Sequence, residues 1–210
     1  MSRFLLLLLL LLPQRLPLND LLDSVSRTYG RLKNFSAEFE QISQDFSNQT
    51  ARQRGHVYLQ SGRKARFEYV SPVQKTEYFD GQTYTSYLPA PVFQAHRMPV
   101  GKVSDDRLAV FHLVGNPESP WKDQFREWEE PRTPPLTPGD RVIRLIPRSK
   151  DLKDVLVEVD PGTFLIRRFV FTYADGERNE FRFSDIKTAP LDPSIFKFKP
   201  PPGVEVLEVR

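Results

Sequence analysis

Histidine and cysteine would be the residues best suited to hold a metal ion in this chain. The three histidines, His56, His96 and His112, are widely separated, and none shows the His-x-His or His-x3-His spacing that lets two imidazoles share one metal. The chain has no cysteine, which excludes disulfides, thiolate chemistry and Cys-ligated zinc. We therefore predict no metal site and no cofactor.

Two acidic pairs, Asp105-Asp106 and Glu129-Glu130, could in principle supply a general acid and a general base. The first pair follows Ser104 at the expected start of a helix, where carboxylates interact favourably with the helix dipole, and the second lies in an expected loop. The chain also lacks the Gly-x-Ser-x-Gly elbow and the phosphate-loop spacing. These observations predict a protein that is not an enzyme.

Apolar residues alternate with polar ones along several stretches, which is typical of strands with one buried face. Near the middle of the first half, Ala65, Phe67 and Tyr69 fall on one face and Arg66 and Glu68 on the other. The same period of two returns in three later runs: Val155, Val157, Val159; Phe169, Phe171, Tyr173; and Phe181, Phe183. Because no catalytic group accompanies these runs, the apolar face itself is the candidate functional surface.

Two helices are expected beside the strands. The first begins at an Asn19 or Asp20 cap and continues to Leu32, with apolar residues at helical spacing and Gly30 near its end. The second spans residues 104–114, with Leu108, Phe111 and Val114 on one side and Gly115 after it. Prolines from Pro117 to Pro138 predict a broken loop between the two halves of the chain.

About ten strands are predicted, a number at which an open twisted sheet tends to curl. They begin with the run that starts at Phe35 and continue with 55–60, 64–69, 75–79, 82–88, 92–98, 142–146, 155–159, 164–173 and 178–186.

Composition predicts one globular domain without the excess of basic residues that is typical of nucleic-acid-binding proteins. The 210 residues are 39% hydrophobic and 27% charged. Leaving out Arg3 and Arg15 near the N-terminus, 28 basic residues balance 27 acidic ones.

The N-terminus resembles a secretory leader. A basic start at Arg3 precedes Phe4 and the run from Leu5 to Leu12, which is too short to span a membrane. We expect residues 1–18 to be a signal peptide and residues 19–210 the mature domain in the periplasm. An uncleaved anchor and a misplaced start are the alternatives.

Several motifs in register resemble the outer-membrane lipoprotein carrier family (LolA). They are Phe35-Ser-Ala-Glu-Phe-Glu-Gln41, Arg66-Phe-Glu-Tyr-Val-Ser-Pro72, Phe79-Asp-Gly81, Phe183-Ser-Asp-Ile186, Leu191-Asp-Pro-Ser-Ile-Phe-Lys-Phe198 and Pro201-Pro-Gly-Val-Glu-Val206. The resemblance implies an α+β protein with a single curled antiparallel sheet, forming an incomplete, unclosed β-barrel with covering helices. It also implies a periplasmic chaperone that carries lipoprotein acyl chains from the inner to the outer membrane.

The resemblance also implies partners and a site. An inner-membrane ABC-type lipoprotein-releasing complex would supply the lipoprotein to a monomeric carrier, and an outer-membrane acceptor, if present, would receive it. Burying an acyl chain contributes about 0.8 kcal/mol per methylene, so the carrier needs an apolar cavity. The residues expected to line that cavity are Phe35, Phe39, Leu59, Phe67, Tyr69, Tyr84, Leu108, Phe111 and Val114.

The family holds a lid helix closed with an arginine just before the strand that corresponds to residues 64–69. A gapless match places Ser61 at that position, and Arg63 lies two positions further on. We expect residues 104–114 to form the lid, with Arg63 and Ser104 positioning it.

Three other functions remain open at this point. The same fold could carry free lipids or glycolipids, or it could act as a module that senses lipidated proteins. A secreted β-rich hydrolase is the third alternative, and a co-purifying acyl chain would separate a carrier from it.

Overall fold

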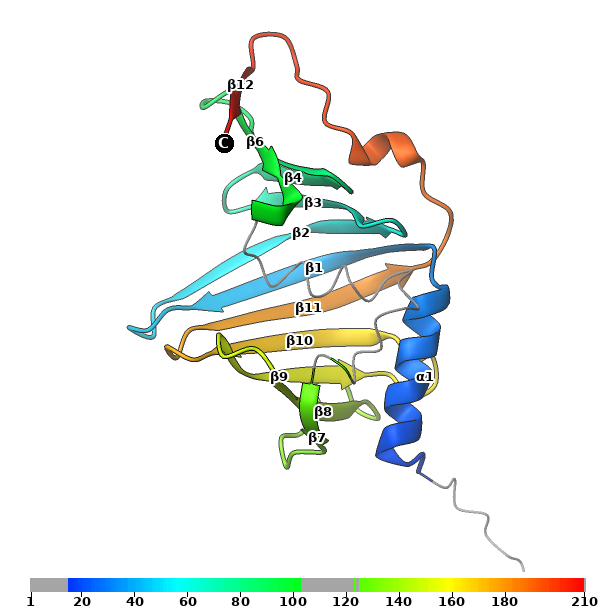
Figure 1. The fold of residues 1–210 in the computed structure, drawn as a ribbon. Coiled ribbons are helices and arrows are strands. Elements are labelled where there is room, and N and C mark those ends of the chain that lie inside the picture. The colour runs from blue at the N-terminus through cyan, green and yellow to red at the C-terminus, as the bar shows by residue number, and fades with distance from the viewer. Residues whose placement is uncertain (1–14, 103–122, 124, 210) are drawn as a thin grey trace, which may run out of the picture.

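The period of two in the sequence becomes one sheet of twelve strands, accompanied by a single α-helix in the described part of the chain (Figure 1). The structure is a computed structural model that describes residues 15–102, 123 and 125–209. The helix α1 spans Leu18–Arg31. The strands are β1 Asn34–Gln44, β2 Thr50–Gln60, β3 Lys64–Ser71, β4 Lys75–Asp80, β5 Thr83–Leu88, β6 Gln94–Pro99, β7 Phe125–Glu129, β8 Arg141–Pro147, β9 Leu152–Val159, β10 Ile166–Tyr173, β11 Arg178–Lys187 and β12 Glu205–Glu208. Two short 3-10 helices are η1 Val100–Lys102 and η2 Pro193–Phe196.

Pairing of β1 with β11 joins the two halves of the chain. The strand order is β12-β6-β5-β4-β3-β2-β1-β11-β10-β9-β8-β7, so each half is a meander and the first strand lies beside the eleventh. In this register Phe39 lies opposite Phe183 and Gln41 opposite Phe181. Since directly opposed residues share a face, the apolar sides of both halves form one continuous surface.

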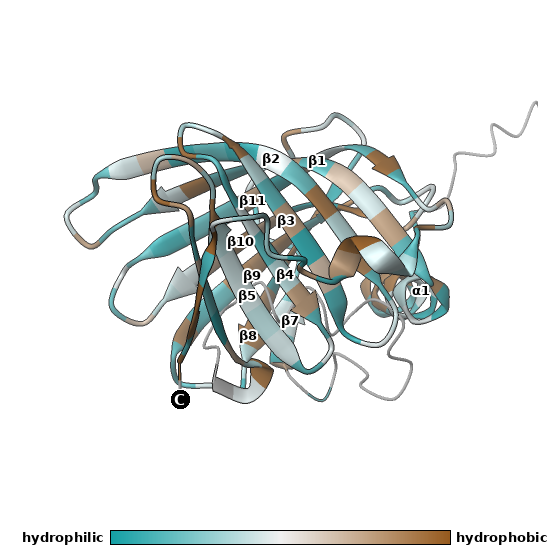
Figure 2. Ribbon diagram, turned by 90° about the horizontal axis from the view of Figure 1, so that it is seen from above, coloured by the Kyte–Doolittle hydropathy of each residue, from teal (hydrophilic) through white to brown (hydrophobic). Residues whose placement is uncertain are grey.

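The sheet is not closed, because its end strands β12 and β7 each pair with a single neighbour in the described chain. This confirms the predicted unclosed, curled sheet. Coloured by hydropathy, the strands show brown and teal bands that alternate along their length (Figure 2). The alternation is that of a sheet with one apolar and one polar face.

Two strands were not predicted. Strand β7 lies inside the proline-rich stretch that was expected to be a loop, and a bulge between Phe125 and Glu127 interrupts its period of two. The bulge lets Phe125 and Trp128, three positions apart, both pack against the buried cluster. Prolines Pro131 to Pro138 follow β7 and do form a loop.

Strand β12 pairs in parallel with β6, so the sheet is mixed and the prediction of a purely antiparallel sheet is wrong here. A long connection brings the chain from β11 past β3 and β4 before β12 begins (Figure 1). Parallel pairing requires such a crossover, whereas a hairpin would have reversed the direction. Phe196, on η2, is fully buried and holds this connection against the sheet.

Helix α1 begins at Leu18, and no side chain caps it, so the predicted Asn19 or Asp20 cap is wrong. The Asn19 Oδ1 atom instead accepts a hydrogen bond from Trp128 Nε1 at 2.7 Å. The helix presents Leu21, Leu22, Val25 and Tyr29 to the core, as the helical spacing predicted, and it ends one residue after Gly30.

The predicted leader boundary falls inside the first turn of α1. Just before that helix, Arg15 pairs with Glu130 at 3.1 Å, and the Leu16 carbonyl accepts a hydrogen bond from Arg141. The division at residue 18 stays a prediction.

Candidate ligand-binding face

The apolar side of the sheet, here called the inner face, gathers most of the predicted ligand residues. Phe35, Phe39, Leu59, Phe67 and Tyr69 are each no more than 3% exposed and belong to one buried cluster, and partly buried Tyr84 packs against it. The strands that carry them, β1, β2, β3 and β5, reach this face through the alternation read from the sequence.

Aromatic rings in edge-to-face, tilted and stacked contact make up the centre of the inner face. The Phe39 ring lies 5.7 Å from the Phe67 ring and 6.4 Å from the Phe181 ring, measured between centroids. Nearer to α1, the Phe35 ring lies 6.0 Å from Phe183, which in turn lies 6.3 Å from Phe169. Such contacts favour offset and perpendicular arrangements, so the surface consists of ring edges and faces with few polar atoms.

Gly55 leaves space for these rings, and sequence reasoning did not single it out. A Cβ atom at Gly55 would lie 1.8 Å from the Glu68 carbonyl oxygen and 3.0 Å from Phe39 Cε1. Gly55 is opposite Phe39 on one side and Tyr69 on the other. The signal in the sequence was a lone glycine inside a strand, which often marks close backbone approach.

Helix α1 packs against one end of the inner face. The hydroxyl oxygen of Tyr29 accepts a hydrogen bond from the Ile166 backbone N–H at 2.9 Å, and the Tyr29 ring lies 6.4 Å from Phe35. Burial raises the pKa of the Tyr29 hydroxyl above its ordinary value, so this group stays neutral. The helix is thereby fixed to both halves of the sheet.

Polar side chains interrupt the inner face further along the strands, and we call them the polar band: Gln41, Ser43, Tyr69, Lys75, Glu77 and Asn179. The Tyr69 hydroxyl donates to Gln41 Oε1 at 2.9 Å, and Gln41 Nε2 donates to Asn179 Oδ1 at 3.1 Å. Ser43 Oγ donates to the same Asn179 oxygen at 3.4 Å. Sequence reasoning missed this network, although Gln41 and Ser43 share the spacing of Phe35 and Phe39.

Lys75 and Glu77 complete the polar band on β4. The Lys75 Nζ atom lies 2.9 Å from Glu77 Oε1 and 4.1 Å from the centre of the Tyr69 ring. The Glu77 side chain is only 3% exposed, whereas that of Lys75 is 25% exposed. A carboxylate buried in an apolar surface needs a cation beside it, so Lys75 is held in place by both neighbours.

Four predicted residues lie outside the described residues: Leu108, Phe111, Val114 and Ser104. Arg63 is described and lies in the turn between β2 and β3, where it is exposed and has a φ of 60°. The backbone N–H of Ser61, at the position of the family arginine, donates to the Lys33 carbonyl at 3.0 Å. The lid and its positioning by Arg63 therefore stay predictions.

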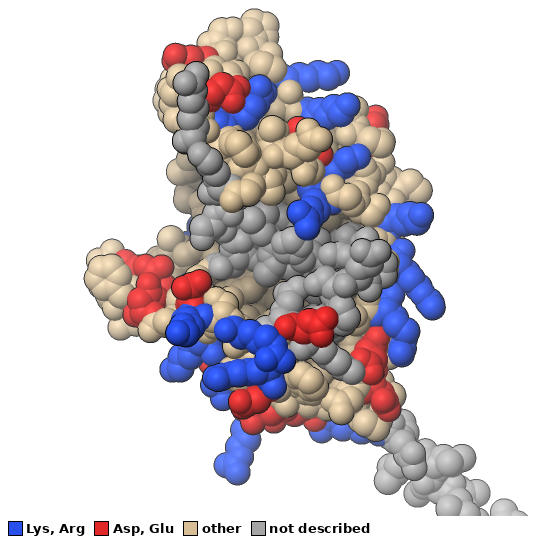
Figure 3. Space-filling view, in the orientation of Figure 1, with Lys and Arg blue, Asp and Glu red and all other residues tan. Residues whose placement is uncertain are grey.

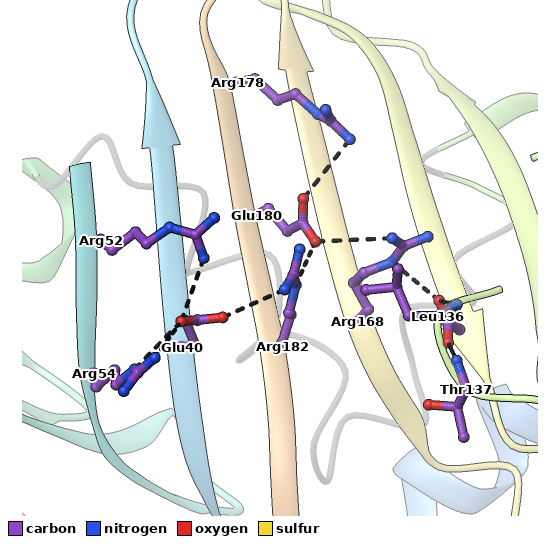
Figure 4. Close-up of polar contacts among 10 residues, drawn as sticks. Glu40, Arg52, Arg54, Leu136, Thr137, Arg168, Arg178, Glu180 and Arg182 are labelled. Atoms are coloured by element: carbon purple, nitrogen blue, oxygen red, sulfur yellow. Dashed lines mark hydrogen bonds and ion pairs between the residues drawn. The ribbon is translucent and has the colours of Figure 1, made fainter. Parts of the chain in front are cut away.

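The opposite side of the sheet, the outer face, carries a ladder of alternating charges that runs from β2 through β1, β11 and β10 to β9 (Figure 4). Arg182 on β11 lies 3.4 Å from Glu40 on β1 and 2.7 Å from Glu180 on its own strand. Arg168 on β10 lies 3.8 Å from Glu180 and 3.1 Å from Glu158 on β9. Glu158 also accepts the backbone N–H groups of Leu136 and Thr137. The ladder thus fixes the proline-rich loop to the outer face.

Charged groups of both signs also mix on the surface shown in Figure 3, most visibly in its lower half, where β7 to β9 lie.

The described residues contain no group of three or more His, Asp or Glu positioned to hold a metal ion. Among the same residues, no helix has the length and hydrophobicity needed to cross a membrane.

The sequence that forms this sheet matches a known protein family. Residues 30–199 match the family described as outer membrane lipoprotein carrier protein LolA. The chain belongs to the LolA family. This match covers the strands of the inner face and both halves of the sheet, and it confirms the family suggested by the motifs from Phe35 to Val206.

Known LolA relatives are similar along nearly their whole length. An outer-membrane lipoprotein carrier protein of Proteus mirabilis is 25% identical over 193 residues, covering 91% of this chain and 90% of the relative. One of Haemophilus influenzae is 28% identical over 196 residues, covering 93% and 90%. The crystal structure of an uncharacterized conserved protein from Thermus thermophilus superposes with a TM-score of 0.59 at 15% identity, covering 91% and 98%, and shares the fold.

Proposed function

We propose that this protein is a periplasmic chaperone that binds the acyl chains of lipoproteins on its inner face and carries them from the inner to the outer membrane. The observation that carries the proposal is the continuous aromatic surface formed by Phe35, Phe39, Phe67 and Tyr69 on one unclosed sheet. Membership of a carrier family supports it.

Physical chemistry accounts for such a surface. A chain of roughly fifteen methylenes would lose about 0.8 kcal/mol for each methylene that entered water. A protein that removes this chain from a bilayer must offer a comparable apolar contact area. Because the rings of the inner face touch one another at their edges, an entering acyl chain can replace ring contacts with chain contacts.

The donor we propose is an inner-membrane ABC-type lipoprotein-releasing complex, and the recipient is an outer-membrane acceptor if one is present. The carrier acts as a monomer and needs no catalytic group, since binding and release are the whole reaction. Leu59 and Tyr84 extend the proposed site on β2 and β5. The predicted lid residues Leu108, Phe111 and Val114 belong to the same proposal.

Tyr84→Glu tests this assignment. Tyr84 is partly buried on the inner face, where a carboxylate would place a negative charge against the acyl chains. Binding of a fluorescent diacyl lipopeptide by the purified mature protein should weaken at least tenfold, while circular dichroism stays unchanged. Tyr58→Glu, on the outer face of β2, is the matched control and should bind as the wild type does.

Two results would contradict the proposal. Equal binding by folded Tyr84→Glu and wild-type protein would show that the ligand does not bind to the inner face. Mass spectrometry of lipids extracted from the periplasmic protein provides the second test: free glycolipid in place of acylated peptide would favour a lipid carrier of the same fold.

A further inference from the structure

The inner face changes character along the strands, from apolar and rich in aromatic rings beside α1 to hydrogen-bonding at the polar band. On β1 this change occurs between Phe39 and Gln41. Phe35, at the α1 end, lies six residues before Gln41, and a strand rises by about 3.3 Å per residue, which separates the two by roughly 20 Å. The hydrocarbon core of a bilayer is about 30 Å thick, so an acyl chain of one leaflet spans roughly 15 Å. On β1 the apolar stretch that precedes Gln41 is therefore long enough to accommodate an acyl chain.

We propose that the polar band binds the ester groups at the head of the acyl chains, and that the chains themselves point toward α1. This inference rests on the proposed function, because it assigns an orientation and a chemical class to the ligand of the same face. The ligand class is a peptide with ester-linked acyl chains, in which an apolar tail ends in carbonyl oxygens.

Ester carbonyls accept hydrogen bonds but donate none, so a matching site must present donors. Lys75 has three N–H donors, of which one is used by Glu77, and its side chain is one quarter exposed. Both hydrogen bonds described at Asn179 use its Oδ1 atom, and its Nδ2 group is a second donor, carried by β11 opposite Ser43 of β1. Gln41 and Tyr69 link these two donors across β1 and β3.

The remaining polar band groups hold the donors in position. Glu77 is 2% exposed and lies opposite Phe67 on β3 and Ser86 on β5, so its carboxylate cannot turn to water. It fixes the Lys75 ammonium at 2.9 Å, and the Tyr69 ring lies under that ammonium at 4.1 Å. The buried Glu77 carboxylate therefore positions the partly exposed Lys75 ammonium on the inner face.

Two matched lipopeptides test the inference directly. One carries two ester-linked palmitoyl chains, and its twin carries ether-linked chains of equal length and so lacks the carbonyl acceptors. Wild-type protein should bind the ester form about tenfold more tightly, because one hydrogen bond to a charged donor has that effect on an equilibrium. Lys75→Met removes the stronger donor and retains the apolar stem, so it should lose most of the ester preference.

The ester preference is the ratio of two affinities measured on the same variant. A variant that is partly unfolded lowers both affinities equally, so its ester preference is unaffected by the loss of stability. Asn179→Ala, away from the buried ion pair, should reduce the ester preference by a smaller factor. Lys64→Met, on the outer face of β3, is the control and should keep the full preference.

Each outcome has a distinct meaning. Equal affinity of wild-type protein for the two lipopeptides would overturn the polar band proposal and leave the carrier function standing. An unchanged ester preference in Lys75→Met would do the same. Failure of both lipopeptides to bind wild-type protein would instead contradict the proposed carrier function itself.

Discussion

The rings of Phe39 and Tyr69 meet edge to face, 5.1 Å apart and at 83°, on either side of Gly55. Gly55 on β2 is the direct neighbour of Phe39 on β1 and of Tyr69 on β3. The missing side chain at Gly55 lets rings from two non-adjacent strands touch across the strand between them. The aromatic centre of the inner face therefore depends on this glycine as much as on the rings.

Gly55→Ala should be strongly destabilising. The added Cβ would meet the Glu68 carbonyl oxygen at 1.8 Å, a contact that only a shift of β3 could relieve. We expect the free energy of unfolding, measured in urea, to fall by about 3 kcal/mol. Gly101→Ala is the control, because its Cβ position has no described atom within 4 Å apart from its neighbours in the chain, and it should change stability by less than about 0.5 kcal/mol. Equal stability of the two variants would show that β2 and β3 separate easily.

The inner face could be predicted from the sequence because its physical cause is local. Alternation of Ala65, Phe67 and Tyr69 places these side chains on one side of a strand wherever that strand lies in the sheet. Alternation of apolar and polar residues likewise predicted the apolar side of β9, β10 and β11. Helical spacing likewise identified the buried side of α1.

Features that depend on distant parts of the chain could not be predicted this way. Gln41 and Asn179 meet only because β1 pairs with β11, a contact 138 residues apart in sequence. The bulge in β7 and the parallel pairing of β12 are likewise set by the strands that they join. The Asn19 side chain accepts a hydrogen bond from the Trp128 indole and does not cap helix α1. This contact again requires β7, which carries Trp128, to be in position.

Arg168→Met should destabilise the protein far more than the loss of an exposed arginine. Arg168 is 6% exposed and is the cation that lies beside buried Glu158, at 3.1 Å. Removing it deprives the buried Glu158 carboxylate of the ion-pair partner that it has among the described residues, which should cost about 3 kcal/mol of unfolding free energy in urea. Arg52→Met is the control: Arg52 is 57% exposed, and Glu40 keeps Arg54 and Arg182. We expect a change below about 1 kcal/mol there. Similar losses in both variants would mean that the ladder acts only through its net charge.

Alkaline pH should weaken the fold through Tyr29. Burial raises the pKa of its hydroxyl above the ordinary value of 10.0, so the folded protein keeps a proton that the unfolded chain releases. The contribution of the Tyr29 hydroxyl to the free energy of unfolding is fully present below pH 10. It falls as the pH rises further, by up to about 1.4 kcal/mol per pH unit. Urea unfolding at pH 9, 10 and 11 measures the slope. Tyr29→Phe should make it shallower, whereas an identical slope would show that other tyrosines cause the whole effect.

Phe198→Ala should loosen β12 without disturbing the inner face. The Phe198 ring lies 5.4 Å from Tyr78 on β4 and 5.3 Å from Tyr87 on β5, and it is the last aromatic residue before β12. Without these contacts, β12 is held in the described chain by its short parallel ladder with β6, by the Val209 N–H bond to the Arg97 carbonyl and by the Arg97–Glu208 ion pair.

Hydrogen exchange measures this loosening segment by segment. In Phe198→Ala, the amides of residues 205–208 should exchange at least tenfold faster, while those of β1 and β2 keep their protection. Val209→Ala, at an exposed residue just beyond β12, is the control and should leave both regions unchanged. Faster exchange throughout the sheet would instead show that the C-terminal segment supports the whole fold. In that case the tail and the inner face would unfold as one cooperative unit, and release of β12 could not occur independently of the ligand-binding face.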